Sequence, residues 1–213
     1  MSAISLEIDS VKSVLRSVAT DLKSHSEELR QLDAKVGDGD LGVTIELASQ
    51  AMTDYLASSA ETDIGKLLAQ CGMNINKVSP STFGTILASA FMGGGKAVVG
   101  KEKIGVNELI MIGEGAVENI KKRGKAEAGD KTLLDALIPA VETLKEDIAG
   151  GMNEQESLES ALKSAEDGMK STVNMKAKFG RAQWFQKGGV GVQDGGATAI
   201  FYMIRSFVEH IQD

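Results

Sequence analysis

The sequence predicts an all-α fold, an antiparallel bundle or barrel of eight helices with a Gly-rich lid loop. Apolar residues recur at the three- and four-residue spacing of one helix face along almost all of the 213 residues. No run alternates apolar and polar residues over the length of a strand. The connections between the periodic segments are short, which favours neighbouring helices that run antiparallel. We expect residues 1–213 to form one domain, because this length suits a single core.

Four helices are predicted in the first half of the chain. The first has a continuous apolar face and is followed by a short helical stretch that leads into an acidic loop. The fourth opens with a turn, is rich in alanine and is expected to stop at three consecutive glycines. The predicted ranges are 8–22 with a continuation to 33, from 42 or 43 onward, 64–78, and a helix that follows the turn at "SPSTFG" and stops at the glycines at 93–95.

Four more helices are predicted in the second half. Pro139 lies inside the sixth helix and should kink it or require a local compensation. Asn153 is a suitable N-cap for the seventh, because its side-chain oxygen can accept bonds from N–H groups of the first turn. The predicted ranges are 106–122, about 133–148, from 154 onward, and about 196–212.

Four loops should meet at one end of this fold. Alternate connections of an antiparallel bundle share an end, so the loops after the first, third, fifth and seventh helices converge. These loops read "GDGDLG", "SPSTFG", "RGKAEAGDKT" and "FGRAQWFQKGGVGVQDGGA". Their glycines allow backbone N–H groups to approach a ligand closely. We therefore expect the binding site on this rim.

The composition excludes several classes of function. The net charge of −7 argues against a large interface with nucleic acid and against an anionic membrane surface. Cys71 is the only cysteine, which excludes a disulfide framework and a thiolate metal cluster. No segment is apolar over the length that crosses a bilayer. We expect a soluble cytoplasmic protein.

Three aspartates surround the first loop. Asp33 lies on the last turn of the preceding helix, where a carboxylate is unfavourable, and Asp38 and Asp40 follow in the loop. An EF-hand is excluded, because Val43 and Ser49 stand where Gly and Glu are required. Two interpretations stay open. The loop could hold a hard divalent cation such as Mg²⁺, shared with substrate phosphates, or it could be a helix N-cap with spare surface acids.

Residues 181–195 are predicted to form a mobile lid. Trp184 and Phe185 lie in a glycine-rich loop with Arg181 and Lys187, where apolar side chains have little local core to join. Closure over a ligand and packing of a long loop onto its own domain both account for them.

Three segments in this order carry a family resemblance: "LDAKVGDGDLG", "RGKAEAGDKTLLDALIPAVE" and "GRAQWFQKGGVGVQDGGATAI". Together they resemble the nucleotide-binding L subunit of dihydroxyacetone kinase, the DhaL family, along nearly the whole chain. The resemblance implies a closed barrel of eight antiparallel α-helices that binds ADP or ATP at one rim through two Mg²⁺ ions. It also implies transfer of a phosphoryl group to dihydroxyacetone, or a related short ketose, held on a separate K-type subunit.

The resemblance implies roles for individual residues. Asp33, Asp38 and Asp40 match the metal ligands, and Arg181 matches the arginine of the lid. Arg181 is also the candidate catalytic residue, because a planar guanidinium can bridge two oxygens of a transferring phosphoryl group. The positions implied to contact the nucleotide are Leu41, Gly42, Val43, Thr44, Ser79, Ser81, Thr82, Phe83, Gly124, Leu133, Arg181, Asp194, Gly195 and Gly196.

Three short segments depart from the family pattern. Leu41 replaces the histidine of Gly-Asp-x-Asp-His-Gly, "SPSTFG" replaces Gly-Gly-x-Ser-Gly, and "DGG" replaces Asp-Pro-Gly. All three touch the implied nucleotide pocket, while the three metal aspartates remain. This combination favours a divergent but active subtype.

The sequence leaves the partners open. The phosphoryl donor could be a phosphotransferase-system protein that rephosphorylates bound ADP, or it could be free ATP that exchanges in each cycle. The alternative function is a nucleotide-binding regulatory or coactivator module without kinase activity of its own. The oligomeric state is also open, a homodimer included.

Overall fold

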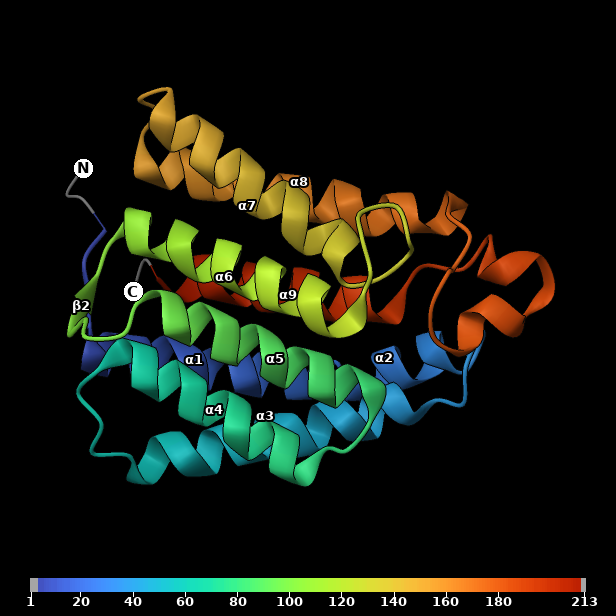
Figure 1. Cartoon of the computed structure of the whole chain (residues 1–213), viewed down its shortest axis with the longest axis horizontal. Coiled ribbons are helices and arrows are strands. Elements are labelled where there is room, and N and C mark those ends of the chain that lie inside the picture. Colours follow the sequence, from blue (N-terminus) through green and yellow to red (C-terminus); the bar gives the residue numbers. More distant parts are fainter. Residues whose placement is uncertain (1–3, 212–213) are drawn as a thin grey trace.

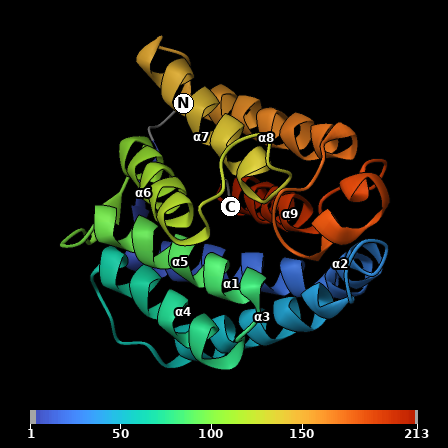
Figure 2. The ribbon, with the colours of Figure 1, turned by 45° about the vertical axis from the view of Figure 1, so that its right-hand side comes forward.

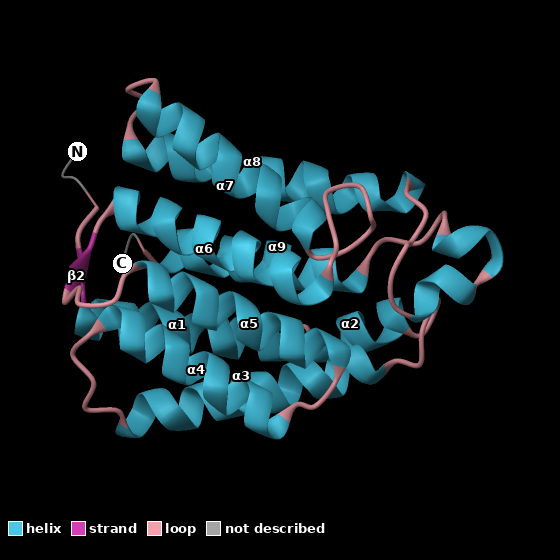
Figure 3. Ribbon diagram, viewed as in Figure 1, coloured by secondary structure: helices cyan, strands magenta, loops and turns pink. Residues whose placement is uncertain are grey.

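The structure is a computed structural model that describes residues 4–211, and α-helices make up most of it (Figure 3). Two short strands, β1 (Leu6–Glu7) and β2 (Lys103–Ile104), pair antiparallel with Leu6 opposite Ile104. The described part of the chain also contains the short 3₁₀ helices η1 (Thr172–Asn174), η2 (Arg181–Trp184) and η3 (Gln186–Gly189). Its nine α-helices are α1 (Ile8–Ser24), α2 (Ser26–Asp33), α3 (Asp40–Ser58), α4 (Ile64–Val78), α5 (Thr82–Ala97), α6 (Val106–Gly124), α7 (Leu134–Ala149), α8 (Glu154–Ser171) and α9 (Gly195–His210).

The helices close into a barrel (Figures 1 and 2). The contacts run in order from α1 to α3, α4, α5, α6, α7, α8 and α9, and α9 packs back against α1. The helix α2 follows α1 after a break at His25 and packs against the same two neighbours, α3 and α9. The consecutive helices α1 and α2 together form one wall of the barrel, so the nine helices make eight walls. The predicted barrel of eight antiparallel helices is confirmed.

Each wall turns an apolar face toward the interior, as the helical spacing predicted. In α1 the buried side chains include Val11, Val14, Val18 and Leu22, which follow one another at three- and four-residue steps. The barrel encloses an apolar cavity of about 260 Å³, lined by side chains of α1, α5, α6, α7, α8 and α9. No helix among residues 4–211 is both long enough and apolar enough to cross a membrane.

The prediction that the fourth helix stops at residues 93–95 is wrong. The helix α5 continues through these glycines to Ala97, because its neighbours come too close for any side chain. A Cβ atom at Gly93 would lie 2.3 Å from the carbonyl oxygen of Gly115 on α6. One at Gly95 would lie 2.5 Å from the carbonyl oxygen of Gly65 on α4. The glycines here are contact positions between helices rather than a loop.

Other boundaries differ less. The helix α3 begins at Asp40, two residues before the earliest predicted start, because Gly39 in a left-handed conformation turns the chain directly into the helix. The two strands were not predicted, since two residues are too few to show alternation. The predicted end of the last helix at Gln212 lies outside the described residues, and α9 ends at His210.

Two local predictions for the second half hold. Asn153 caps α8, because its side-chain oxygen accepts bonds from the N–H groups of Gln155 at 2.9 Å and Glu156 at 3.4 Å. The helix α7 runs through Pro139, and its neighbour supplies the compensation. The carbonyl of Asp135, which Pro139 cannot bond, lies 2.0 Å from where a Cβ atom of Gly168 would be. Glycine on α8 leaves room for that carbonyl.

Candidate functional site

The four loops predicted to converge do meet at one end of the barrel, opposite the end that carries the strands (Figure 1). They surround a pocket of about 380 Å³. Each loop or its adjoining helix end contributes to the lining, with Asp38 from the first, Thr82 from the second, Lys131 from the third and Arg181 from the fourth. The antiparallel order of the helices is therefore what assembles the site.

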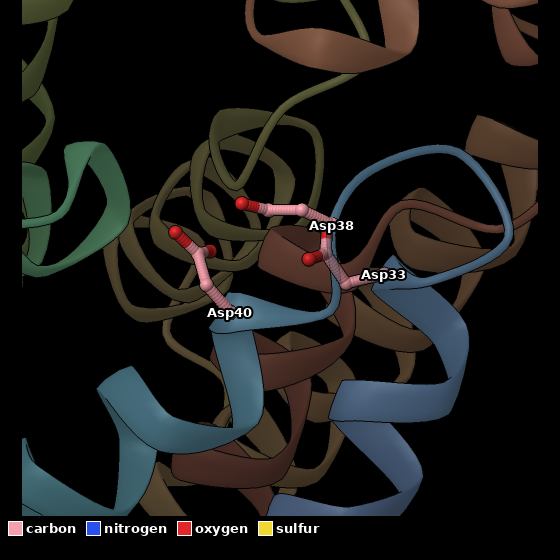
Figure 4. Close-up of side chains that lie close together, drawn as sticks. All are labelled: Asp33, Asp38 and Asp40. Atoms are coloured by element: carbon pink, nitrogen blue, oxygen red, sulfur yellow. The ribbon is translucent and has the colours of Figure 1, made fainter.

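An acidic cluster forms one side of the pocket (Figure 4). Asp33 is the last residue of α2, Asp38 lies in the loop between α2 and α3, and Asp40 is the first residue of α3. One carboxylate oxygen from each of the three lies within 4.8 Å of the others. Gly37 is required for this arrangement, because a Cβ atom there would lie 2.6 Å from Asp33 Oδ1.

The charges of this cluster fit a cation. Asp33 Oδ2 is buried and has no hydrogen-bond partner among the described residues. Burial, and secondarily the charge of Asp33, raises the pKa of Asp40. Asp40 makes no side-chain capping bond at the start of α3, which does not support the helix-cap part of the alternative, although Asp38 and Asp40 are both exposed at the surface. Hard carboxylate oxygens this close together suit a divalent cation with oxygen preference.

A positive potential from the backbone faces the acids. The helices α3, α5, α7 and α9 all begin at this rim, at Asp40, Thr82, Leu134 and Gly195. Helix N-termini carry partial positive charge and unpaired N–H groups, which favour phosphate and other anions. A rim that combines a carboxylate cluster with several helix N-termini is suited to an anion that brings its own metal ion.

The opposite side of the pocket is apolar. Side chains from α5, α6 and the loop that follows α6 form it, namely Phe83, Ile86, Ile120, Ala126 and Leu133. Ile120 and Ala126 are also part of the hydrophobic core, so this wall is continuous with the barrel interior. Such a surface suits a flat apolar face of a ligand rather than its charged end.

Most of the residues predicted to bind metal or nucleotide line this pocket. They are Asp33, Asp38, Asp40, Leu41, Thr82, Phe83, Gly124, Leu133, Arg181, Asp194, Gly195 and Gly196. The structure does not bring Gly42, Val43, Thr44, Ser79 and Ser81 into the lining.

Four of these five residues support the rim instead. Gly42 lets α3 approach α2, because a Cβ atom there would lie 2.5 Å from the carbonyl oxygen of Ser26. Thr44 is buried and its hydroxyl donates to Ser81 Oγ at 2.8 Å, while Ser81 caps the start of α5. Ser79 is buried beside this cap, and Val43 is exposed on α3. Contact of these residues with a nucleotide stays a prediction.

The lid loop, defined here as residues 175–194, extends from the end of the barrel that carries the pocket (Figures 1 and 2). Arg181 is on this loop and forms an ion pair with Asp38, so the loop and the acidic cluster are in direct contact. Trp184 is 83% exposed and therefore does not pack onto the domain. The alternative interpretation, in which the long loop packs onto its own domain, has no support at Trp184.

The three segments that depart from the family pattern contact one another. Leu41 is buried, and a Cβ atom at Gly195 would lie 2.6 Å from Leu41 Cδ2. Phe83 of "SPSTFG" packs against the same core cluster as Leu41 and lies 3.4 Å from where a Cβ atom of Gly196 would be. The Leu41 side chain thus occupies space that a residue bulkier than glycine would need at position 195. The three departures are therefore neighbours in one part of the structure.

Sequence reasoning missed a polar network beneath the lid loop. Lys131 lines the pocket and is buried, with a left-handed backbone conformation at φ 61°. Asp130 and Asp135, also buried, bond the backbone of the same loop. The signal was present in the segment "GDKTLLD", where three charged residues lie in a stretch that leads into an apolar helix.

Comparisons with known proteins agree with this fold. The DAK2 domain family matches residues 35–209, a range that includes Asp38 and Asp40 and begins just after Asp33. The "PEP-dependent dihydroxyacetone kinase, ADP-binding subunit DhaL" of Escherichia coli is 30% identical over 182 residues, which cover 85% of this chain and 87% of that protein. A second ADP-binding subunit DhaL, from Listeria innocua, is 29% identical and is covered over 93% of both chains.

Longer proteins match over part of their length. The human triokinase/FMN cyclase is 31% identical over 205 residues, which cover 93% of this chain and 34% of that protein. The crystal structure of the dihydroxyacetone kinase from C. freundii in complex with AMP-PNP and Mg²⁺ superposes with a TM-score of 0.72 at 25% identity. That match covers 93% of this chain and 33% of the solved chain. The chain therefore spans most of the separate DhaL subunits and about a third of the single-chain proteins.

Proposed function

The chain belongs to the DAK2 domain family, and from that premise we propose that it is the nucleotide-binding subunit of a dihydroxyacetone kinase. In this proposal ADP or ATP binds in the rim pocket with Mg²⁺, in the form of two ions. A phosphoryl group passes from the nucleotide to dihydroxyacetone, or a related short ketose, held on a separate K-type subunit. The relatives named as ADP-binding subunits, matched along most of their length, support this assignment.

One observation carries the proposal. Three carboxylates with oxygens within 4.8 Å of one another face a pocket onto which four helix N-termini open. Neither feature alone specifies a ligand. Together they suit a di- or triphosphate with its metal ion, because the anion needs the N-termini and the metal ion needs the carboxylates.

The acidic cluster would hold the metal through Asp33, Asp38 and Asp40. When bound, Mg²⁺ supplies neutralisation of the negative charge on the phosphate oxygens. The protein residues then position the nucleotide. The N–H groups at the starts of α3 and α9 would bind the phosphates, and the apolar side of the pocket with Phe83 and Leu133 would take the base.

Arg181 is the proposed catalytic residue. Its ion pair with Asp38 places the guanidinium beside the acidic cluster, where the phosphates would lie. The side chain is 63% exposed, so it can exchange Asp38 for a phosphoryl oxygen without breaking a buried contact. A guanidinium offers paired donors to the oxygens of a transferring phosphoryl group, and such charge stabilisation is the main contribution of a protein to this reaction.

The departures from the family pattern are compatible with activity. Leu41 fills space against Gly195, and the pocket retains its acidic cluster and its helix N-termini. We propose a divergent subtype whose nucleotide contacts differ near α3 and α9 while the metal-binding side is kept.

A reconstitution experiment tests the proposed function. The purified protein is mixed with a K-type subunit and dihydroxyacetone, and product is measured either with ATP or with a phosphorylated phosphotransferase-system protein as donor. Product in one arm, lost in the Asp38→Ala variant, is expected and identifies the donor. Mg-ADP binding without product in either arm would instead assign the regulatory module. Mass spectrometry of the purified protein adds a second criterion, since ADP retained through purification favours the recycled mode.

A further inference from the structure

Lys131 is a buried lysine in an unusual backbone conformation. Its side chain is 3% exposed, and its φ of 61° places it in the left-handed region. Non-glycine residues rarely adopt this conformation unless the surrounding structure holds them in it. Lys131 lies on the loop between α6 and α7, at the floor of the pocket.

The ammonium of Lys131 bonds only to backbone carbonyls. It donates to Thr172 at 2.8 Å, to Gly189 at 2.8 Å and to Val192 at 2.6 Å, with Met175 at 3.3 Å. An ammonium has three N–H groups, so these acceptors use all of its donors. Lys131 has none left for a ligand, and a direct role in binding phosphate is therefore excluded in this arrangement.

These carbonyls lie at the two ends of the lid loop, on either side of its outer part, residues 176–188. Thr172 and Met175 precede its outer part, and Gly189 and Val192 follow it. The ammonium therefore joins the chain that enters the lid loop to the chain that leaves it. Two backbone bonds reinforce the junction, from the N–H of Ala177 to the Gly188 carbonyl at 2.9 Å and from that of Gly191 to the Val173 carbonyl at 2.7 Å.

The loop that carries Lys131 is itself rigidly held. Asp135 accepts bonds from the N–H groups of Gly129 at 2.5 Å and Thr132 at 2.6 Å, on either side of Lys131. Asp130 accepts from the N–H of Glu127 at 2.9 Å and pairs with Lys178 on the lid loop. The base of the lid loop is thus attached to a fixed support on the barrel.

We propose that Lys131 is a positioning residue that holds the lid loop so that Arg181 lies beside the acidic cluster. Arg181 is on the outer part of the lid loop, between the two ends that Lys131 joins, and it forms an ion pair with Asp38. Without the ammonium the two ends of the loop can separate, and Arg181 loses its fixed approach to the phosphates. This inference rests on the proposed function for its effect on catalysis.

The test compares Lys131→Met with Lys187→Met. Lys187 is a matched control, because it too has a left-handed backbone, at φ 56°, and lies exposed on the lid loop with no side-chain bond among the described residues. Hydrogen exchange of the peptides that cover residues 175–192 is measured first, without nucleotide. Lys131→Met should raise exchange at Ala177 and Gly191 by about tenfold or more, and Lys187→Met should leave it unchanged.

Kinetics then separate positioning from general damage. Lys131→Met should lower kcat for phosphoryl transfer by about tenfold or more, because small misplacements of a catalytic group are costly. The Kd for Mg-ADP should stay within about threefold of the unsubstituted protein. Lys131→Gly, which relieves the left-handed backbone while it removes the ammonium, should behave like Lys131→Met and guards against a folding defect of either variant.

Three results would overturn the inference. Unchanged exchange at the lid base would show that Lys131 does not hold the loop. Faster exchange with unchanged kcat would show that the junction does not position Arg181. Equal losses in kcat and Mg-ADP affinity would indicate a general structural role. Failure of the proposed function is recognised separately, as absence of turnover in the unsubstituted protein. The Lys131 inference is then tested by hydrogen exchange at the base of the lid loop and by whether Mg-ADP changes Trp184 emission in the Lys131→Met variant.

Discussion

The wall formed by α4, α5 and α6 and the pocket rim use glycine for opposite purposes. In the wall, Gly93 and Gly115 let two helices touch, and a Cβ atom on either would lie within 2.6 Å of a carbonyl oxygen on the other. On the rim, Gly180 and Gly191 have positive φ, and a Cβ atom on either would meet no other atom within 4 Å. The wall glycines are needed for packing, whereas the rim glycines are needed for backbone conformation.

The rim also contains polar groups and a backbone conformation that are unfavourable for stability. The rim keeps three carboxylates together, with a buried Asp33 oxygen that lacks a partner among the described residues and a lysine in a left-handed conformation. Each of these features is unfavourable for the isolated protein. Features that lower stability and gather at one site are typical of a site shaped by its ligand. Substitutions on the rim should therefore change binding or turnover, and substitutions in the wall should change stability.

The largest effect is expected from the acidic cluster. Asp38→Ala and Asp40→Ala should each lower Mg-ADP affinity by about 100-fold or more, since even residues that only orient a metal ligand contribute about 10- to 100-fold. Removal of one carboxylate also relieves repulsion, which is consistent with the raised pKa of Asp40. The Tm without Mg²⁺ should hold or rise, while the Tm shift caused by Mg-ADP should vanish. Calorimetry that finds unchanged affinity would contradict the metal assignment.

The next effect concerns turnover on the same rim. Arg181→Lys keeps the charge but loses the paired donors of the guanidinium. We expect kcat to fall by about 100-fold with little change in Mg-ADP affinity, because the interaction is made with the transferring phosphoryl group. Steady-state kinetics with a K-type subunit measures this. If Arg181 only pairs with Asp38 at the surface, turnover will stay nearly unchanged and the catalytic assignment must be withdrawn.

A substitution in the wall should show the opposite pattern. In Gly93→Ala the new methyl would lie 2.3 Å from the carbonyl oxygen of Gly115, a backbone atom that cannot move aside by a rotamer change. Overpacking of this kind costs about 1–3 kcal/mol, and the higher helix propensity of alanine compared with glycine offsets at most about 1 kcal/mol of that cost. We expect a net loss of about 2 kcal/mol in the free energy of unfolding, measured by denaturant titration.

The matched control is Gly113→Ala on α6, where the atoms nearest to the methyl would belong to the side chain of Val141. It should be less destabilising than Gly93→Ala, because Val141 can shift. Neither variant should alter Mg-ADP affinity. A wall substitution that weakens nucleotide binding while the protein remains folded would remove the distinction between the two regions.

A smaller effect is expected on the pH dependence of protein stability, through Asp194 on the rim. Burial raises the pKa of Asp194, the N-cap of α9, to about 6. Because this folded-state pKa is above that of an unfolded aspartate, near 4, the stabilising contribution is complete below about pH 4 and is lost as the pH rises to about 6. Asp194→Asn keeps an oxygen that can accept from Ala197 and removes the charge.

At pH 7 the Asp194→Asn variant should be more stable than the unsubstituted protein by about 1 to 2 kcal/mol in the absence of nucleotide. The difference should shrink as the pH falls to about 4, which thermal unfolding at several pH values will show. A stability difference that does not depend on pH would indicate that Asp194 is not held as the raised pKa implies.

The smallest effect is spectroscopic. Trp184 is the only tryptophan and is 83% exposed on the lid loop, so its fluorescence reports this loop alone. Closure over Mg-ADP should shift its emission to shorter wavelength and slow protease cleavage of the lid loop. Gly93→Ala should leave this response intact. If saturating nucleotide changes neither signal, the lid loop does not close over the ligand.

The amino-acid sequence was sufficient for most of the fold, because helix formation and capping depend on neighbours a few residues away. The spacing of apolar residues predicted the helices, and Asn153 predicted the cap of α8. The antiparallel order then predicted which four loops would meet, and the clustered aspartates indicated a cation at that end. Where prediction failed, as at residues 93–95, a partner helix distant in sequence was responsible.

Only the tertiary structure decided which residues support the site and how. The bonds from Lys131 span 41 to 61 residues of sequence, and no local pattern connects a lysine on one loop with carbonyls on another. The contact of Leu41 with Gly195 and the pairing of Arg181 with Asp38 likewise join opposite parts of the chain. Local sequence determines the periodic elements because their hydrogen bonds close within one turn. The site depends on side chains brought together by closure of the barrel, and that closure is a property of all eight walls at once.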